Sequence, residues 1–479
     1  MRFLGPLPAH DLTYSDVFLV PSRSAVTSRL DVDLTPGDGS GATIPIVSAN
    51  MNSVTGPLLA ATLARRGGLG VLPQDLPLQD LAAAIRWVKE QPVSWDTPVV
   101  LAPEQTVAEA LKLLPPAEGH GVVLRGTSGE ELGAIPASRL GTALPDAQLG
   151  DLVHGAITAL DADDLDGPRA AFDLMVAAGL EFALVQRHGR IVGTLSRRSA
   201  LRGTLYRPAL DAGGRLRVAA ALGINGDVAA KAIALAAEGV DVLVLDTAHG
   251  HQEGMLRALA TVKELGLGIP IAAGNIVTAE GVRDLVDAGA DIVKVGVGPG
   301  AMCTTRMMTA VGRPQFGAVL ETAEAARALG AHVWADGGVR YPRDVALALA
   351  AGAASVMIGS WFAGTIEAPG LLERDDAGRL YKQSWGMAST KAVHERFGRL
   401  DPYELARKEL FAEGISSSKI YLDPLRPSVE DLLDMITSGL RSSFTYAGAG
   451  TLAAFQDRAV VGFQSAAGYE EGKALPVSW

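Results

Sequence analysis

The sequence predicts an α/β protein whose main domain is a (β/α)8 barrel with a second module inserted into it. Short apolar runs alternate with alanine-rich helical stretches, and eight such runs occur along the chain. Between the second and third runs, over residues 93–206, this alternation stops. Continuous apolar strands that alternate with helices are typical of parallel strands buried on both faces. Eight units favour a closed barrel, with an open doubly wound sheet as the alternative.

The eight predicted strands are short and largely apolar, which suits a position in the centre of a sheet. They cover residues 44–48, 69–72, 217–222, 240–245, 269–273, 292–297, 332–335 and 355–358. Helices are predicted between them, and several are followed by a glycine suited to a C-terminal cap. Examples are residues 57–66, 228–238, 279–288 and 318–329. Residues 1–43 are expected to form an irregular lead-in.

The interrupting segment contains an internal repeat of helix, strand and strand. In the first half we expect a helix at 106–114 and strands at 121–124 and 131–135; in the second, a helix at 167–178 and strands at 182–185 and 190–195. Such a repeat predicts a separate α/β module. The predicted domains are therefore residues 1–92 (the first two barrel strands), 93–206 (the module) and 207–479 (the rest of the barrel and a C-terminal segment).

Composition narrows the class of protein. The 479 residues are 48% hydrophobic, which is enough for a large core and a second module. A single cysteine excludes a disulfide framework and a cysteine-based metal site, and it indicates a cytoplasmic protein. Neither a signal peptide nor a membrane-spanning apolar run is recognisable. The net charge of −11 argues against a nucleic-acid partner.

Polar residues and glycines follow almost every predicted strand. Active sites of such barrels are built at the carboxyl ends of the strands, so these residues are candidates for the site. They are Asn50, Asn52, Gln74, Asn225, Asp227, Asp246, His249, His251, Asn275, Cys303, Asp336, Gly337, Gly338, Gly359 and Ser360. Structural roles stay open for single residues, since Asp246 could cap a helix and His249 could pack against its loop. Gly359 and Ser360 would suit phosphate binding through backbone N–H groups.

The only cysteine, Cys303, follows a glycine-proline-glycine turn at 298–300 in a polar loop. This setting predicts an exposed nucleophile, because a thiol ionises readily and the nearby Arg306 would favour the thiolate. Thr304 or Thr305 could relay a proton beside the sulfur. The alternative is a small buried hydrophobic residue.

The segment after the barrel is charged and without clear periodicity over residues 371–419, which predicts a long loop over the barrel mouth. An amphipathic helix is predicted over 428–438, with Ser428 as its N-cap and Asp431 three residues further on.

The loop around Cys303, with Gly298, Gly300, Thr305 and the run Val-Gly-Arg-Pro-Gln at 311–315, resembles the catalytic loop of the IMP dehydrogenase and GMP reductase family. Further matches follow in family order across nearly the whole chain. They are Ala49-Asn50-Met51, Asp246 with Gly250, Ala273-Gly274-Asn275, Asp336-Gly337-Gly338, Gly359-Ser360, Trp385-Gly386-Met387 and Glu413-Gly414. The inserted module resembles a tandem pair of CBS motifs.

This resemblance implies an oxidoreductase in which Cys303 attacks C2 of a purine nucleotide. By position, Thr305 and Glu413 would be the catalytic acid pair. The nucleotide, GMP or IMP, would be bound by Ser48, Asn50, Met51, Asp336, Gly337, Gly338, Gly359, Ser360, Gly386 and Met387. The nicotinamide cofactor, expected to be NADPH, would contact Asp246, Thr247, Asn275 and Gly296. Backbone carbonyls of Gly298, Gly300 and Cys303 would hold a monovalent cation, K+.

Two activities share the covalent step. A dehydrogenase hydrolyses the intermediate with an arginine-tyrosine pair in the flap, whereas the nearest pair here is Arg396-Phe397, and phenylalanine has no hydroxyl. The resemblance therefore favours a GMP reductase, with IMP dehydrogenase as the alternative. A non-catalytic purine sensor is a third possibility, although it would not need the nucleophile. The family also implies a homotetramer or homo-octamer. A purine-nucleotide effector at the CBS module is one hypothesis, and a role of the module as an assembly surface is the alternative.

Overall fold

The structure is a computed structural model that describes all residues except 154–157, 387–388, 392–393, 395–400, 411–417 and 474–479. Its centre is a closed barrel of eight strands in the order β11-β12-β13-β14-β15-β16-β3-β4, and all adjacent pairs are parallel. The strands are β3 (Ile46–Ser48), β4 (Leu69–Leu72), β11 (Ala219–Leu222), β12 (Val242–Asp246), β13 (Ile271–Ile276), β14 (Ile292–Val295), β15 (His332–Asp336) and β16 (Ser355–Ile358). The closed barrel is confirmed and the open sheet is excluded.

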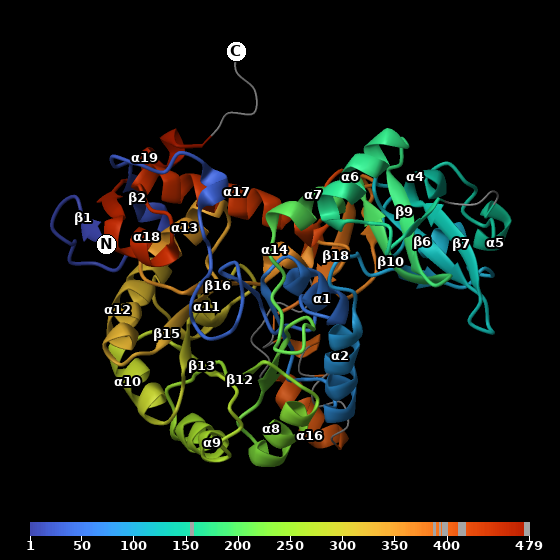
Figure 1. The fold of residues 1–479 in the computed structure, drawn as a ribbon. Helices are drawn as coiled ribbons and strands as arrows, with labels where there is room; N and C mark the ends of the chain where they lie inside the picture. The colour runs from blue at the N-terminus through green and yellow to red at the C-terminus, as the bar shows by residue number, and fades with distance from the viewer. Residues whose placement is uncertain (154–157, 387–388, 392–393, 395–400, 411–417, 474–479) are drawn as a thin grey trace.

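Helices surround the barrel (Figure 1). The apolar core of the barrel domain has two layers, one between the strands and the helices and one inside the barrel. The helices are α1 (Pro57–Arg65), α2 (Leu78–Glu90), α8 (Val228–Ala237), α9 (Glu253–Glu264), α10 (Ala279–Asp287), α12 (Gln315–Ala328) and α13 (Pro342–Ala350), with short α11 (Thr305–Thr309) and α14 (Ser360–Ala363) at the barrel mouth. Small residues let the helices lie close: a Cβ at Gly70 would come within 2.5 Å of the Ala60 Cβ. The interior layer is closed by Trp334, whose Nε1 donates to Asp38 at 2.7 Å.

The inserted segment folds as two three-stranded sheets, one for each half of the repeat. The first holds β5 (Val99–Leu101), β6 (Gly121–Arg125) and β7 (Glu131–Pro136), and the second β8 (Ala159–Asp161), β9 (Phe182–Arg187) and β10 (Arg190–Ser196). Its helices are α3 (Val107–Ala110), α4 (Ala137–Leu140), α5 (Leu149–Leu152), α6 (Gly167–Ala177) and α7 (Arg197–Leu205). The first helix is shorter than expected, because a capping box of Thr106 and Glu109 starts it but the chain leaves the α-helix after Ala110.

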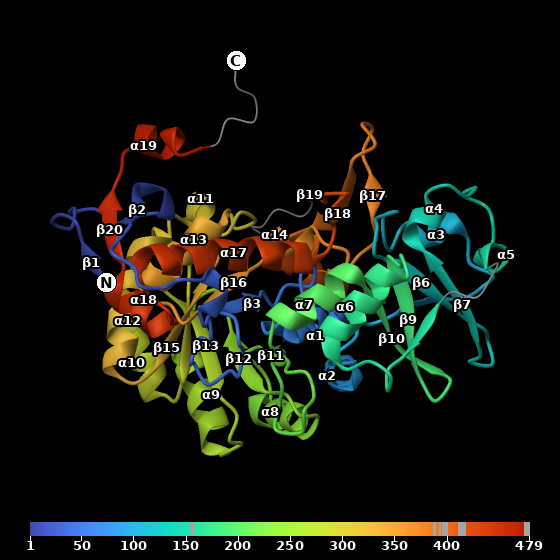
Figure 2. The same cartoon turned by 45° about the horizontal axis from the view of Figure 1, so that its top comes forward.

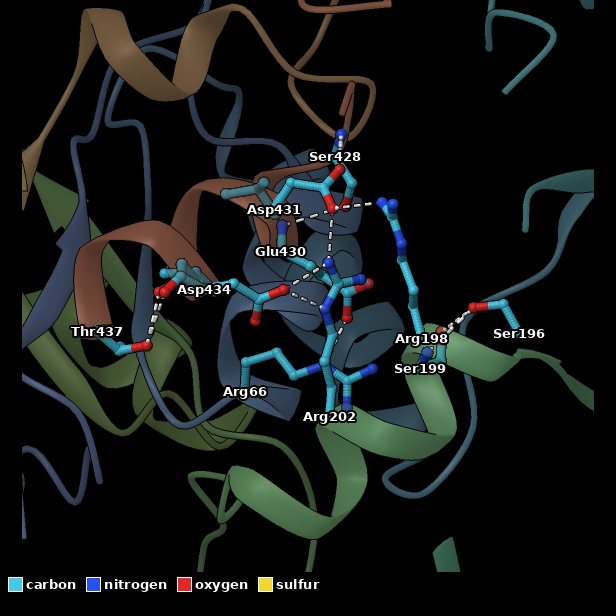
Figure 3. A network of polar contacts seen from close by, with 12 residues as sticks. Arg66, Ser196, Arg198, Ser199, Arg202, Ser428, Glu430, Asp431, Asp434 and Thr437 are labelled. Carbon is cyan, nitrogen blue, oxygen red and sulfur yellow. Dashed lines mark hydrogen bonds and ion pairs between the residues drawn. The ribbon is translucent and has the colours of Figure 1, made fainter. Parts of the chain in front are cut away.

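The module lies at one side of the barrel in both views (Figures 1 and 2), and a buried ionic network joins the two. Arg202 on α7 contacts Glu430 at 3.0 Å, Asp431 at 2.6 Å and Asp434 at 2.8 Å, all on α17 (Val429–Ala447). Arg66, just after α1, contacts Glu430 at 2.5 Å (Figure 3). The acidic residues of α17 thus bind Arg66 from the barrel and Arg202 from the module, and so join the two parts of the protein.

Two segments expected to be irregular contain sheets. The lead-in supplies β1 (Arg2–Phe3) and β2 (Val17–Val20), which pair with β20 (Val460–Phe463), along with 3-10 turns η1 (Tyr14–Asp16) and η2 (Arg29–Asp31). The segment expected to be a long loop contains a three-stranded sheet of β17 (Glu373–Arg374), β18 (Leu380–Ser384) and β19 (Ser418–Tyr421), and α16 (Pro402–Leu410). Leu372, Leu380 and Leu422 give this sheet its own small core. So few apolar positions form no recognisable pattern in the sequence, so the sheet was not predicted.

The helix expected over 428–438 is confirmed at its start but is longer. Ser428 and Asp431 form the capping box, and α17 continues to Ala447 before Gly448 ends it in a left-handed conformation. The chain then forms α18 (Leu452–Arg458) and α19 (Ala466–Glu471). No helix in the described part of the chain is long and apolar enough to cross a membrane.

Candidate active site

A cavity of about 760 Å³ opens at the carboxyl ends of the barrel strands. Most of the residues singled out from the sequence line it. These are Asn50, Met51, Gln74, Asn225, Asp246, Thr247, Asn275, Gly296, Gly298, Gly300, Cys303, Thr305, Asp336, Gly337, Gly338, Gly359, Ser360 and Gly386. All eight barrel strands, or the loops that follow them, contribute to this lining, and closure of the barrel brings these sequence-distant residues together.

Cys303 lies on the loop between β14 and α11, with its side chain exposed to the cavity. Its Sγ donates to Thr305 Oγ1 at 3.2 Å, and its backbone N–H donates to the Gly300 carbonyl at 3.0 Å. The loop depends on Gly298, whose φ of +82° suits glycine and whose Cβ would lie 2.1 Å from the Arg306 Cγ. The buried alternative for this cysteine is excluded, and the geometry is that of an accessible nucleophile beside a hydroxyl.

The end of the loop that carries Cys303 is fixed by Arg313. Its guanidinium donates to both carboxylate oxygens of Asp11, at 2.7 and 3.0 Å, and to the Val277 carbonyl at 2.9 Å. It also contacts Glu321 at 2.7 Å. Hydrogen bonding to Arg313 lowers the pKa of the Asp11 carboxyl below its usual value. The N-terminal lead-in therefore braces the loop that carries Cys303.

Two carboxylates at the floor of the cavity share one buried lysine. Lys294 on β14 forms ion pairs with Asp246, at the end of β12, and with Asp336, at the end of β15. Asn50 donates to Asp246 Oδ2 at 3.0 Å, and Asn275 donates to Asp336 Oδ2 at 3.0 Å. Burial by itself would lower the pKa of the Lys294 ammonium, but the two carboxylates outweigh it and the pKa is raised. The group is therefore a charged network with fixed side-chain orientations.

The other side of the cavity presents backbone rather than side chains. Gly338 has a φ of +82°, and a Cβ there would approach the Pro299 Cβ to 3.2 Å. Helix α14 begins at Ser360, and the first N–H groups of a helix have no partner within it. Backbone amides and glycines next to Asp336 offer a place for an anionic group linked to a diol.

Two buried amide oxygens that belong to cavity-lining residues, Gln74 Oε1 and Asn275 Oδ1, have no hydrogen-bond partner within the described residues. Buried acceptors are normally satisfied. Their position suits the donor groups of a ligand, and an amide N–H2 would satisfy either of them.

Several candidates lie elsewhere. Ser48 is fully buried and accepts from Thr55 Oγ1 at 2.8 Å, and it does not line the cavity. Asp227 caps α8, and His251 pairs with Asp284 at 2.7 Å. Met387, Arg396, Phe397 and Glu413 lie outside the described residues.

Sequence reasoning missed Lys294, because it treated residues 292–297 as an apolar strand. The signal was a single lysine between Val293 and Val295, since a charge inside a buried strand needs partners. Gln315, which donates to the Val295 carbonyl at 2.8 Å and to the Asp336 carbonyl at 3.2 Å, was also missed.

The side chains of the described residues offer no metal site: they contain no group of three or more His, Cys, Asp or Glu placed to hold a metal ion. A monovalent cation on backbone carbonyls stays a prediction.

Known proteins with similar sequences and structures identify the family of this chain. The family model described as "IMP dehydrogenase / GMP reductase domain" matches residues 11–474. The chain belongs to the IMP dehydrogenase and GMP reductase family. Among its relatives, GMP reductase from Mycobacterium tuberculosis is 56% identical, covering all of both chains. The inosine-5'-monophosphate dehydrogenase of Aquifex aeolicus is 36% identical, covering 96% of this chain and 94% of the relative.

A solved structure of the family has a similar fold. It is a crystal structure of a cysteine-to-alanine variant of GMP reductase from Trypanosoma brucei in complex with guanosine 5'-monophosphate. The TM-score is 0.69 at 31% identity, and the alignment covers 98% of this chain and 99% of the other. The family membership expected from the catalytic loop is thereby confirmed.

Proposed function

We propose that this protein is a GMP reductase, which converts GMP to IMP and ammonia with NADPH. The observation that carries the proposal is the difference between its relatives: 56% identity to mycobacterial GMP reductases over the full length, against 36% to IMP dehydrogenases. Such an activity needs an accessible nucleophile, and the exposed Cys303 with Thr305 beside it supplies one. A sensor that only binds purines would not need this nucleophile.

The proposed reaction begins when the Cys303 thiolate attacks C2 of the purine and forms a carbon–sulfur bond. The bond from C2 to the exocyclic amine then breaks, and the departing amine takes a proton. We assign the relay of this proton to Thr305, and the contact of its hydroxyl with the sulfur at 3.2 Å supports the assignment. Glu413 is the proposed second member of the acid pair. Hydride addition to C2 and loss of the sulfur then give IMP.

Nucleotide binding is assigned to the cavity side that carries Asp336, Gly337, Gly338, Gly359 and Ser360. Asp336 would accept from the ribose hydroxyls, and the backbone amides near Gly338 and Ser360 would hold the phosphate. Asn50, Met51 and Gly386 line the region assigned to the base. Met387 is proposed here from its sequence position, while Ser48 is not, because it lies behind the cavity wall.

A second group of cavity residues, next to those assigned to the nucleotide, fits a nicotinamide. The Asn275 Oδ1 and Gln74 Oε1 acceptors have no partner among the described residues, and a nicotinamide carboxamide carries two N–H donors. Asn275 donates to the Thr247 carbonyl at 3.0 Å and to the Gly296 carbonyl at 2.8 Å, and Asp246 precedes Thr247 in the lining. The chemistry supplied by NADPH, when it is bound, is a hydride for C2. The chain's own residues would hold the ring against the purine.

Further parts of the proposal rest on the family. They are a cytoplasmic location, a homotetramer or homo-octamer, K+ on the carbonyls of Gly298, Gly300 and Cys303, and a purine-nucleotide effector at a CBS pair in the module. A second cavity of about 340 Å³ lies at the junction of module and barrel, and both arginines and carboxylates line it: Arg65, Arg198, Arg202, Asp96, Glu118, Glu367, Glu430 and Asp431.

The test replaces Cys303 with alanine and Thr305 with valine. Cys303→Ala should bind GMP in calorimetry but show no turnover, because the nucleophile is gone while the cavity is intact. Thr305→Val should form a protein–purine adduct, seen by mass spectrometry after an acid quench, with slower ammonia release. Turnover of GMP by the Cys303→Ala protein would contradict covalent catalysis.

A further inference from the structure

Lys294 is the least exposed charged side chain of the barrel mouth, with 2% of its side chain accessible. It lies in the middle of β14, between the buried Val293 and Val295. An unpaired ammonium in such a place would cost several kcal/mol, so its partners determine what it does.

Those partners come from three other strands or the loops that follow them. The Nζ atom forms ion pairs with Asp246 and, at 3.4 Å, with Asp336, and it lies 3.3 Å from Asn50 Oδ1. All three partners line the cavity, as Lys294 itself does. The lysine therefore contacts one carboxylate from each side of the proposed site, the ribose side and the nicotinamide side.

The amides around this network fix which oxygens stay available. Asp246 uses Oδ1 for Lys294 and Oδ2 for Asn50. Asp336 uses Oδ2 for both Lys294 and Asn275, and its Oδ1 makes no hydrogen bond with the described residues. Among the described residues, Asp336 is thus held through one oxygen, which leaves the other as an acceptor for a sugar hydroxyl.

We infer that Lys294 is a positioning residue that holds Asp336 and Asp246 in their working orientations and so couples the nucleotide and cofactor sides of the cavity. This inference rests on the proposed function, because that function assigns Asp336 to the ribose and Asp246 to the nicotinamide. Without the ammonium, the two carboxylates repel each other and lose the common contact that fixes them.

The chain contains a matched control for a purely structural role. Lys89 is also buried, with 4% of its side chain accessible, and it pairs with two aspartates, Asp211 at 2.9 Å and Asp241 at 2.6 Å. Asp241 immediately precedes β12, whereas Asp246 is the last residue of that strand. Lys89 and Lys294 thus make the same kind of buried contact at opposite ends of one strand.

The experiment compares Lys294→Met with Lys89→Met in the full-length protein. Both variants should lose stability. Only Lys294→Met should also weaken GMP binding by about tenfold, measured by calorimetry in the Cys303→Ala background, and reduce kcat/KM by about 100-fold. Equal effects of the two variants on GMP affinity would overturn the inference.

A second readout separates positioning from general damage. In an Asp246→Asn background Lys294 holds only the Asp336 carboxylate. The double variant should therefore have a kcat/KM less than about threefold below that of Asp246→Asn alone. Lys89→Met should leave kcat/KM unchanged in either background. If the effects of Lys294→Met and Asp246→Asn simply multiply, Lys294 does not act through the carboxylate.

Should Lys294→Met fail to fold, Lys294→Gln keeps one hydrogen bond and removes the charge. It should show the same loss of GMP affinity, and an unchanged affinity would overturn the inference. Turnover by the wild-type protein distinguishes failure of this inference from failure of the proposed function. If the wild type oxidises IMP with NAD instead, the affinities of the same variants are measured with IMP in place of GMP.

Discussion

The buried ionic network between module and barrel gives a quantitative prediction for Arg202→Leu. Arg202, whose side chain is 7% exposed, contacts Glu430, Asp431 and Asp434. Removal of one partner from a buried ion pair costs about 3 to 5 kcal/mol. Arg66 stays on Glu430 in the variant and compensates part of that loss. We therefore expect the lower end, about 3 kcal/mol less free energy of unfolding.

Chemical denaturation of the full-length protein measures this loss, and limited proteolysis shows whether the junction opens first. Arg198→Leu is the matched control, because Arg198 also lies on α7 and contacts Asp431 at 3.3 Å but is 61% exposed. An exposed pair is worth less than about 1 kcal/mol. Equal losses for the two variants would refute the argument that burial makes the Arg202 network important.

Two further variants test the pH response and the brace of the catalytic loop. Burial raises the pKa of Glu367 to about 7 from 4.5, so between these values the folded state holds a proton that the unfolded chain releases. Stability should fall as pH rises through this range, and Glu367→Gln should remove about 3 kcal/mol of that dependence in denaturation curves measured at several pH values; an unchanged slope would contradict it. Asp11→Asn, which weakens the contact with Arg313, should lower kcat about threefold to tenfold while GMP affinity in the Cys303→Ala background stays constant. Asp173→Asn, on the module surface, is its control, and equal kcat values for the two would contradict the brace.

The barrel could be predicted from the sequence because its signal is local and repeated. Apolar runs such as β4 and β11 are continuous, and polar residues or glycines follow them, so the sequence predicts both the order of the elements and the edge that carries the site. The accessible Cys303 followed from its glycine-rich turn in the same way.

What the sequence did not reveal depends on contacts between distant segments. The β1–β20 pairing joins the two ends of the chain, and the β17–β18–β19 sheet has a core of a few leucines, so neither produces a periodic pattern. Lys294 was hidden because its partners come from other strands. Ser48 was expected in the site from the family resemblance; its hydroxyl accepts from Thr55, and it is not among the cavity-lining residues.

The most direct test of the proposed reaction is nicotinamide absorbance with the purified protein, with ammonia assayed in parallel. One reaction contains GMP and NADPH, and the other contains IMP, NAD and K+. We expect loss of NADPH matched mole for mole by ammonia, with no NADH formed from IMP. NADH formation from IMP without ammonia would contradict the reductase and identify a dehydrogenase, while no change in either reaction, with GMP still bound, would identify a purine sensor.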